Sequence, residues 1–294
     1  MRKSIVAAAT ALTGLAVAGV IVPAGPAAAA LSDVPADCGV STAAYRSDGQ
    51  RLSYVYSGQT TSTKAYVNDN LGWVPTAHQQ IGGAGDDTFF RSTEYAAHPT
   101  DGWLYKVSRQ GELVDGTWRI TAQSASHLKD GFAGTRILAT ASPYLYRVAG
   151  TSLYRYTETY VDDVFTLTSP VRLTTSGWDT VNTLTYERTE GTGTAAVDVL
   201  IGTKSNGELK EWRINRATPT TITSTVLKAS GWAGFTSLST GYCSAHPDGR
   251  ALLGIKATGA ASVHFDADAT DGVGTDLKGG SLGTLGWTAK AYGQ

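Results

Sequence analysis

The segment from Gly177 to Ser230 decides the fold, and it reads GWDTVNTLTYERTEGTGTAAVDVLIGTKSNGELKEWRINRATPTTITSTVLKAS. Alternating apolar residues, frequent β-branched residues and the absence of helical periodicity are typical of strands. Asn206-Gly207 lies between two such runs, a pattern that predicts a tight antiparallel hairpin. The segment therefore predicts one sheet of short strands at Val181–Tyr186, Val197–Lys204, Leu209–Ile214 and Thr221–Leu227.

The opening of this segment recurs along the chain. The recurrences are Gly85-Asp86-Asp87, Gly131-Phe132, Gly177-Trp178, Gly231-Trp232 and Gly286-Trp287, at spacings of 46, 46, 54 and 55 residues. A second landmark, an apolar strand, recurs at Arg51–Tyr56, Trp103–Val107, Tyr144–Val148, Val199–Thr203 and Ala251–Ile255. Because one such sheet cannot bury both faces by itself, the repeats are expected to stack on one another.

These repeats predict an all-β protein, a five-bladed β-propeller with four-stranded antiparallel blades. Four units are expected at about 85–130, 131–176, 177–230 and 231–285, and the fifth is divided between residues 39–84 and 286–294. The N- and C-terminal segments would share one blade and close the ring, which removes free sheet edges at the join. Residues 31–38 are expected to form a short leader.

The first thirty residues have the pattern of a secretory signal peptide. Arg2 and Lys3 precede an apolar run over Ile5–Val22, and Ala28–Ala30 form a small-residue cleavage site. A membrane anchor is the alternative, since the apolar run is about eighteen residues long. The pattern predicts a secreted, extracellular protein, cleaved near Ala30.

The net charge and the spread of the basic residues argue against two classes of binding partner. The chain has 24 Lys and Arg against 25 Asp and Glu, a formal net charge of −1, and the basic residues are scattered. Nucleic acid and anionic membranes are recognised through clustered positive charge, so neither is an expected partner. No cofactor is indicated, and the protein is expected to act as a monomer.

The two cysteines, Cys38 and Cys243, are expected to form a disulfide in an oxidising compartment. In the repeat register they lie on inner strands of neighbouring blades, where a bridge would lock the ring closure. In the loop-entropy model such a bridge contributes at most roughly 5 kcal/mol. A metal site is the alternative, but neither cysteine has a nearby histidine pair, so no metal ligands are predicted.

Together, the Gly-aromatic openings, the Pro-containing turns and the Leu-Tyr-x-Val strands resemble the tachylectin family of five-bladed β-propeller lectins. The clearest matches are Ile137–Val148 followed by Leu153-Tyr154, and His98–Val107. The resemblance covers essentially the whole mature chain. It implies binding of glycans containing N-acetylated amino sugars, such as N-acetylglucosamine or N-acetylgalactosamine, in pockets between adjacent blades.

A sugar pocket needs a flat apolar surface and a few fixed polar groups. The candidates for these roles are Trp178, Trp232, Trp287, Phe132, Asp179 and Asp87. Packing between sheets is the alternative role for the aromatic residues, and also for Trp73 and Trp118, which are expected on outer strands. Asp86 stands where the second unit should carry an aromatic residue, so five equal sites are not expected.

No catalytic residue is predicted. Gly279–Gly283 matches the G-x-S-x-G string but lacks the strand-turn-helix context of a hydrolase. A propeller glycoside hydrolase remains an alternative, and it would need a pair of carboxylates, for which Glu94 and Glu187 are the inner-strand candidates. A protein-interaction or inhibitor platform is the other alternative. The four aspartates that resemble a calcium loop do not follow its spacing: Asp266, Asp268, Asp271 and Asp276.

Overall fold

The computed structural model describes residues 30–161 and 164–293, so the predicted signal peptide lies outside the described residues except for Ala30. The protein is all-β, and its only helical elements in this part of the chain are three short 3₁₀ turns: η1 (Leu31–Asp33), η2 (Trp178–Thr180) and η3 (Gly193–Ala195). Within the described residues, no helix has the length and apolarity needed to cross a membrane.

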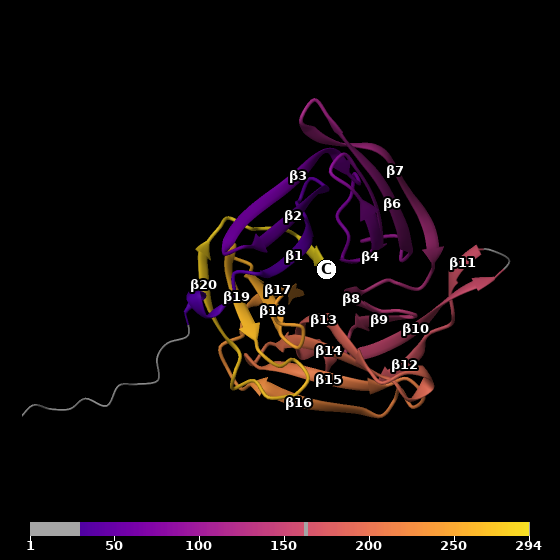
Figure 1. Cartoon of the computed structure of the whole chain (residues 1–294). Coiled ribbons are helices and arrows are strands. Elements are labelled where there is room, and N and C mark those ends of the chain that lie inside the picture. Colours follow the sequence, from indigo (N-terminus) through magenta and orange to yellow (C-terminus); the bar gives the residue numbers. More distant parts are fainter. Residues whose placement is uncertain (1–29, 162–163, 294) are drawn as a thin grey trace, which may run out of the picture.

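The strands are arranged around a common centre, with β1, β4, β8, β13 and β17 close to it and the C-terminal end of the chain beside it (Figure 1). The largest sheet contains three antiparallel runs. The β1–β3 run consists of β1 (Cys38–Tyr45), β2 (Gln50–Ser57) and β3 (Thr60–Asn70), with β21 (Ala291–Gly293) paired to β1. The β4–β7 run consists of β4 (Ala77–Gly85), β5 (Phe89–Ala97), β6 (Leu104–Val114) and β7 (Thr117–Lys129). The β17–β20 run consists of β17 (Phe235–Cys243), β18 (Arg250–Lys256), β19 (Ala260–Asp266) and β20 (Lys278–Thr284).

Two smaller sheets complete the described structure. The β8–β12 sheet consists of β8 (Thr135–Ala141), β9 (Tyr144–Ala149), β10 (Ser152–Val161), β11 (Val164–Leu167) and β12 (Val171–Thr174), with β11 and β12 both paired to β10. The β13–β16 sheet consists of β13 (Val181–Glu190), β14 (Val197–Lys204), β15 (Leu209–Asn215) and β16 (Ile222–Lys228). The predicted hairpin at Asn206-Gly207 is confirmed: β14 and β15 are antiparallel neighbours, and Gly207 has φ 90°.

Short contacts join the three runs of the largest sheet. β1 pairs with β17 at Cys38↔Cys243 and Gly39↔Tyr242, and β3 pairs with β7 through the single parallel contact Val67↔Arg119. The disulfide Cys38–Cys243 lies at the first of these contacts, so the predicted pairing is confirmed. It connects the beginning of β1 to the end of β17.

The two ends of the described chain meet in one run. β21 pairs with β1 over Ala43–Tyr45, and the Lys290 amide donates to the Tyr45 carbonyl at 2.8 Å. The strand order differs from the expectation in one respect. The two terminal segments were expected to share the innermost strand, but β21 forms it alone and β1 lies next to it (Figure 1).

One of the predicted repeat openings lies at a different position in the structure. Gly85 is the last residue of β4, whereas Gly72-Trp73 precedes β4 as the other Gly-aromatic pairs precede their strands. The five glycines of these pairs all have positive φ, at 77°, 79°, 87°, 95° and 69° for Gly72, Gly131, Gly177, Gly231 and Gly286. Such a backbone conformation favours glycine. Trp73 therefore lies in a connection and not on an outer strand, while Trp118 does lie on β7.

Four apolar clusters hold neighbouring runs and sheets together. One joins β1–β3 to β17–β20, one joins β4–β7 to β8–β12, one joins β8–β12 to β13–β16, and one joins β13–β16 to β17–β20. In the part of the chain that the structure describes, no cluster of buried apolar residues joins the β1–β3 run to the β4–β7 run, although the partly exposed rings of Tyr66, Phe90 and Trp118 touch across it. Buried ion pairs occupy that contact instead.

Candidate functional site

The four predicted aromatic residues are buried in the apolar clusters. Phe132, Trp178, Trp232 and Trp287 are 1–4% exposed. Each packs against another ring: Phe132 on Tyr156, Trp178 on Trp212, Trp232 on Phe235, and Trp287 on Tyr54, with centroids 4.9, 5.2, 5.3 and 4.9 Å apart. The structure places their rings between sheets, and of the four only Trp287 also lines one of the two pockets described below.

The two predicted carboxylates are exposed and lie apart from those pockets. Asp179 is in the η2 turn that follows Gly177, and Asp87 is in the turn between β4 and β5. The neighbouring Asp86 closes this second turn, because its Oδ1 accepts from the amides of Thr88 at 2.7 Å and Phe89 at 3.0 Å. An aspartate is suited to such a turn because its side chain can satisfy nearby amides.

The pocket that Trp287 lines lies between β2 and the segment leading to β21, and we call it the Trp287 pocket. It has a volume of about 420 Å³. The rings of Tyr54 and Trp287 are stacked with an interplanar angle of 12°, and Trp287 Nε1 donates to Thr63 Oγ1 at 2.9 Å. Hydroxyl and cationic side chains surround these rings: Arg46, Ser47, Thr63, Thr288 and Lys290.

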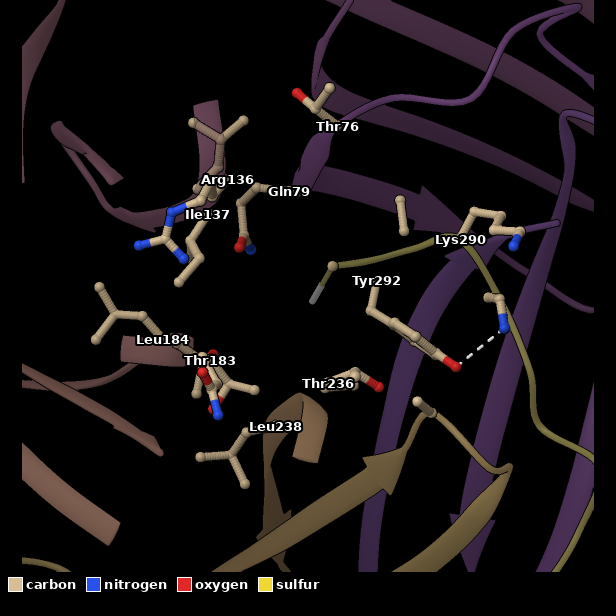
Figure 2. Close-up of a pocket in the computed structure, with 18 residues that line it drawn as sticks. Thr76, Gln79, Arg136, Ile137, Thr183, Leu184, Thr236, Leu238, Lys290 and Tyr292 are labelled. Carbon is tan, nitrogen blue, oxygen red and sulfur yellow. Dashed lines mark hydrogen bonds between the residues drawn. The ribbon is translucent and has the colours of Figure 1, made fainter. Parts of the chain in front are cut away.

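A second pocket adjoins it at the centre of the molecule, and we call it the axial pocket (Figure 2). It has a volume of about 320 Å³ and shares Ala257, Ala289 and Lys290 with the Trp287 pocket. Figure 2 shows Lys290 and Tyr292 on one side and Ile137, Leu184 and Leu238 on the other. This lining comes from the first residues of the inner strands and from residues just ahead of them. The axial pocket therefore opens at the end of the molecule where the inner strands begin.

Both tyrosines of the two pockets are neutral hydrogen-bonding groups at physiological pH. Burial raises the pKa of Tyr54 to about 12, and burial also raises the pKa of Tyr292. Tyr292 Oη accepts from the Ala289 amide at 3.0 Å and donates to the Trp287 carbonyl at 3.1 Å. Tyr292 therefore holds the segment between the two pockets in place.

No Asp or Glu lines either pocket among the residues that the structure describes. The cations are Arg46, Lys290 and Arg136, and Arg136 uses its guanidinium to donate to the carbonyls of Trp178 at 2.6 Å and Val181 at 3.2 Å. The lining combines aromatic, hydroxyl, amide and cationic groups. These groups can bind a polar ligand, but they do not include the carboxylate pair that glycoside hydrolysis requires.

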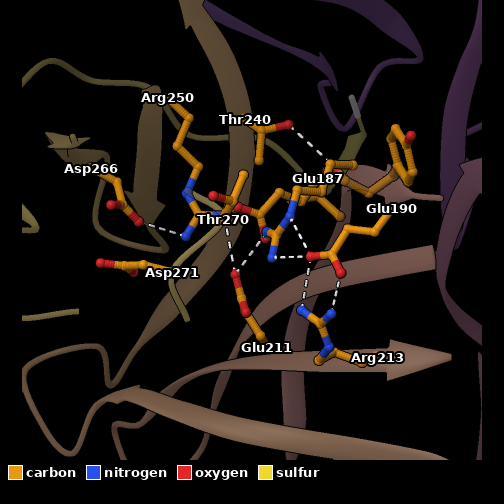
Figure 3. A network of polar contacts seen from close by, with 12 residues as sticks. Glu187, Glu190, Glu211, Arg213, Thr240, Arg250, Asp266, Thr270 and Asp271 are labelled. Carbon is orange, nitrogen blue, oxygen red and sulfur yellow. Dashed lines mark hydrogen bonds and ion pairs between the residues drawn. The ribbon is translucent and has the colours of Figure 1, made fainter. Parts of the chain in front are cut away.

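The two acids considered for catalysis are partners in buried ion networks. Burial raises the pKa of Glu94, but the guanidinium groups of Arg109 and Arg51 outweigh it and bring the pKa to about 2. Glu187 lies against Arg188 at 3.1 Å and against Arg250, in the network of Figure 3 that also contains Glu211 and Asp266. Neither acid lines the Trp287 pocket or the axial pocket.

The other motifs have structural roles. Asp266 accepts from Arg250 at 2.7 Å, while Asp268 and Asp271 accept from the backbone amides of Thr270 and Val273. Among the described residues, no group of three or more ligand-type side chains is arranged to hold a metal ion. Gly279–Gly283 lies within β20, and no helix follows it.

Sequence reasoning missed Tyr54, Tyr292 and Lys290. Tyr54 lies on a strand that was expected, and the alternation of Leu52, Ser53 and Tyr54 places Tyr54 on the same face as Leu52. The alternation does not say what that face contacts. Tyr292 and Lys290 come from the other end of the chain, and only the pairing of β21 with β1 brings them to this site.

No protein-family model matches the chain, and no curated protein matches it. Among solved structures, the chain is similar to a fungal lectin from Aleuria aurantia with a six-bladed β-propeller fold and fucose recognition (TM-score 0.39, 12% identity, covering 83% of this chain and 75% of that one). It is also similar to a putative 6-phosphogluconolactonase from Bacteroides fragilis (TM-score 0.38, 9% identity, 87% and 97%). A third is the periplasmic gluconolactonase of Pseudomonas aeruginosa (TM-score 0.34, 10% identity, 84% and 97%). Similarities of this size carry no argument about the site.

Proposed function

We propose that this protein is a secreted, monomeric, tachylectin-like lectin that binds glycans without cleaving them. Residues 1–30 are its signal peptide, and the mature chain is a closed five-bladed β-propeller. Its ligands are N-acetylated amino sugars, bound in the Trp287 pocket and the adjoining axial pocket. Single pockets of this kind bind weakly, so useful affinity comes from repeated sugars on one surface.

A recurring hydrogen bond supports the five-blade count. With β21 counted as the first strand of the β1–β3 run, each unit has a turn between its second and third strands. A carbonyl of that turn accepts a hydrogen bond from a backbone amide in the connection to the next inner strand. The five pairs are Leu71 to Gly49, Phe132 to Gly102, Trp178 to Thr151, Trp232 to Gly207 and Leu285 to Gly259, at 2.7–3.3 Å. The pairing of β21 with β1 supports the closed ring, since it leaves the two chain ends in one blade.

The observation that carries the function is the lining of the Trp287 pocket. It presents hydroxyl groups and two cations, Arg46 and Lys290, beside the buried, stacked rings of Tyr54 and Trp287, and no carboxylate among the described residues. A pyranose offers C–H faces to aromatic rings and hydroxyls to polar groups. A hydrolase of this blade count would instead need two carboxylates about 5 to 9 Å apart at the site.

The test is calorimetric titration of the mature protein with N-acetylglucosamine, N-acetylgalactosamine and their oligomers. Lys290→Gln and Thr63→Val are expected to weaken binding about fivefold to tenfold each, because each removes one hydrogen-bonding group of the pocket. Trp178→Phe is the matched control, since Trp178 holds the equivalent position in another unit but lines neither pocket. Absence of binding to every one of these sugars would end the lectin proposal.

A further inference from the structure

The contact between the β1–β3 run and the β4–β7 run encloses a groove that no motif of the sequence indicated. It has a volume of about 770 Å³ and extends to Thr140, Tyr186 and Thr240, toward the ends of β8, β13 and β17. This is the end of the molecule opposite the axial pocket, which lies where the inner strands begin. The groove shares only Gln79 with the axial pocket and no lining residue with the Trp287 pocket, and we call it the β2/β4 groove.

The groove stays open because the residues along it are small. Ser41, Ala43 and Ser53 line it from β1 and β2, and the β4 segment Gly82–Gly85 lines it from the other side. The other inter-sheet contacts are filled by large apolar side chains at comparable places, such as Leu200 and Trp212 between β8–β12 and β13–β16. A hollow of this size is within the range of ligand pockets, roughly 300–1,000 Å³.

One wall of the groove is aromatic. Tyr66 on β3 and Phe90 on β5 are partly exposed, and their ring centroids are 5.0 Å apart. Trp118 packs against both rings, with centroid distances of 6.0 Å from Tyr66 and 5.5 Å from Phe90. Two packed, partly exposed rings that line the groove offer an aromatic surface to the C–H face of a sugar ring.

The polar groups of the groove are mainly donors. Gln80 has its Oε1 engaged by Arg51 Nη2 at 2.9 Å, which leaves its amide NH₂ group to donate. Ser92 is 9% exposed, lines the groove, and its Oγ has no hydrogen-bond partner among the described residues. A buried hydroxyl without a partner is costly, and a ligand in the groove would supply one.

The groove also carries a positive charge that has no ion-pair partner among the described residues. Below it, Arg51 and Arg109 are balanced by Glu94 and Asp69, with ion-pair distances of 3.1, 3.0 and 2.7 Å for Arg51–Glu94, Arg109–Glu94 and Arg109–Asp69. Lys64 lines the groove, is exposed, and has no ion-pair partner among the described residues. Arg91 is at the rim, with its guanidinium 5.3 Å from the Phe89 ring centroid. No carboxylate lines the groove in the described part of the chain.

We propose that the β2/β4 groove binds an anionic saccharide, a chain of pyranose sugars that carries carboxylate groups. The sugar ring stacks on Tyr66 and Phe90, its carboxylate pairs with Lys64, and its hydroxyls accept from Gln80 and Ser92. This groove meets the axial pocket only at Gln79, and it selects for a charge that the amino-sugar ligands lack.

The test titrates the mature protein with trigalacturonic acid and with its uncharged methyl ester. The acid is expected to bind about tenfold more tightly than the ester, and raising the salt concentration is expected to weaken binding of the acid alone. Lys64→Gln should weaken binding of the acid about tenfold and remove its salt dependence, and Ser92→Ala should weaken it about threefold.

Two lysine variants serve as controls. Lys278→Gln removes an exposed lysine on β20, and Lys290→Gln alters the amino-sugar pockets, so both should bind the acid as the wild type does. Lys64 is exposed, so Lys64→Gln should keep the wild-type melting temperature. Equal binding of acid and ester, no binding of the acid, or a loss with Lys290→Gln but not with Lys64→Gln would each overturn the proposal.

Discussion

Two contacts between neighbouring sheets of this protein are built in opposite ways. Between β8–β12 and β13–β16, apolar side chains such as Leu200, Trp178 and Trp212 fill the space. Between β1–β3 and β4–β7, the space is occupied by ion pairs around Glu94, and above them lies the β2/β4 groove. The first contact stabilises the fold through burial of apolar surface. The second contact keeps polar groups and an open groove with room for a ligand.

The difference shows how a repeated fold can vary its contacts. Apolar burial stabilises by roughly 25 cal/mol per Å² and depends little on geometry. A buried ion network must satisfy every charge, since desolvation offsets most of the Coulomb attraction. The β1–β3 contact with β4–β7 should therefore add less net stability than the apolar contact, but should be more sensitive to loss of one partner.

The largest effect is expected from breaking the ion network. Glu94→Gln leaves Arg51 and Arg109 buried without Glu94's charge, which should lower the free energy of unfolding by about 3–5 kcal/mol. Urea denaturation at pH 7 measures this. A loss below about 1 kcal/mol would mean that the network does not stabilise the contact.

The corresponding test of the apolar contact removes one of its buried side chains. Leu200 is 0% exposed and belongs to the cluster between β8–β12 and β13–β16. Leu200→Ala should lower the free energy of unfolding by about 2–5 kcal/mol through lost burial and a residual cavity. The same urea titration at pH 4.5 should give an unchanged difference from the wild type, because no charge is involved. A difference that changes with pH would contradict the apolar assignment.

A third prediction uses pH to separate the two contacts. Burial lowers the pKa of His78, next to Glu94, from 6.5 to about 4. Between these values the unfolded chain binds a proton that the folded chain does not, so acidification favours unfolding. His78 alone should remove about 2–3 kcal/mol of stability between pH 7 and pH 4.5.

His78→Gln should abolish that share of the pH dependence. His264, in the β17–β20 run, also has its pKa lowered to about 4 by burial and should retain its own share. The comparison is therefore between the slopes of the variant and the wild type, measured by urea denaturation at several pH values. An unchanged slope in His78→Gln would contradict the assignment.

The smallest effects are expected from removing or adding a single hydroxyl group. Ser53→Ala, in the β2/β4 groove, should change the free energy of unfolding by less than about 0.5 kcal/mol, since the site is open to solvent. Ala139→Ser, at a fully buried position in the apolar contact, should cost about 1–3 kcal/mol because it buries a hydroxyl without a partner. Thermal or urea unfolding of the pair measures both, and equal costs would remove the contrast between the contacts.

Much of the fold could be predicted from the sequence because its causes are local. The Asn206-Gly207 turn specifies a hairpin wherever it occurs, and glycines before an aromatic residue mark a backbone with positive φ. The error at Gly85 is also local in origin. Gly82–Gly85 resembles a turn in composition, but its hydrogen bonds with β5 make it the end of a strand, and Gly72-Trp73 is the true equivalent of the other Gly-aromatic pairs.

By itself the sequence determined the strands, the hairpins and the all-β class, because these depend on neighbouring residues. It also determined the pairing of Cys38 with Cys243, because two cysteines allow only one disulfide. Only the tertiary structure decided that Trp287 packs on Tyr54 and that the space beside Tyr66 is open. Alternation along a strand says which side chains share a face, but not which sheet that face meets. Both pockets lie where two faces meet, and the Trp287 pocket depends on contacts between residues more than two hundred positions apart, such as Trp287 with Thr63.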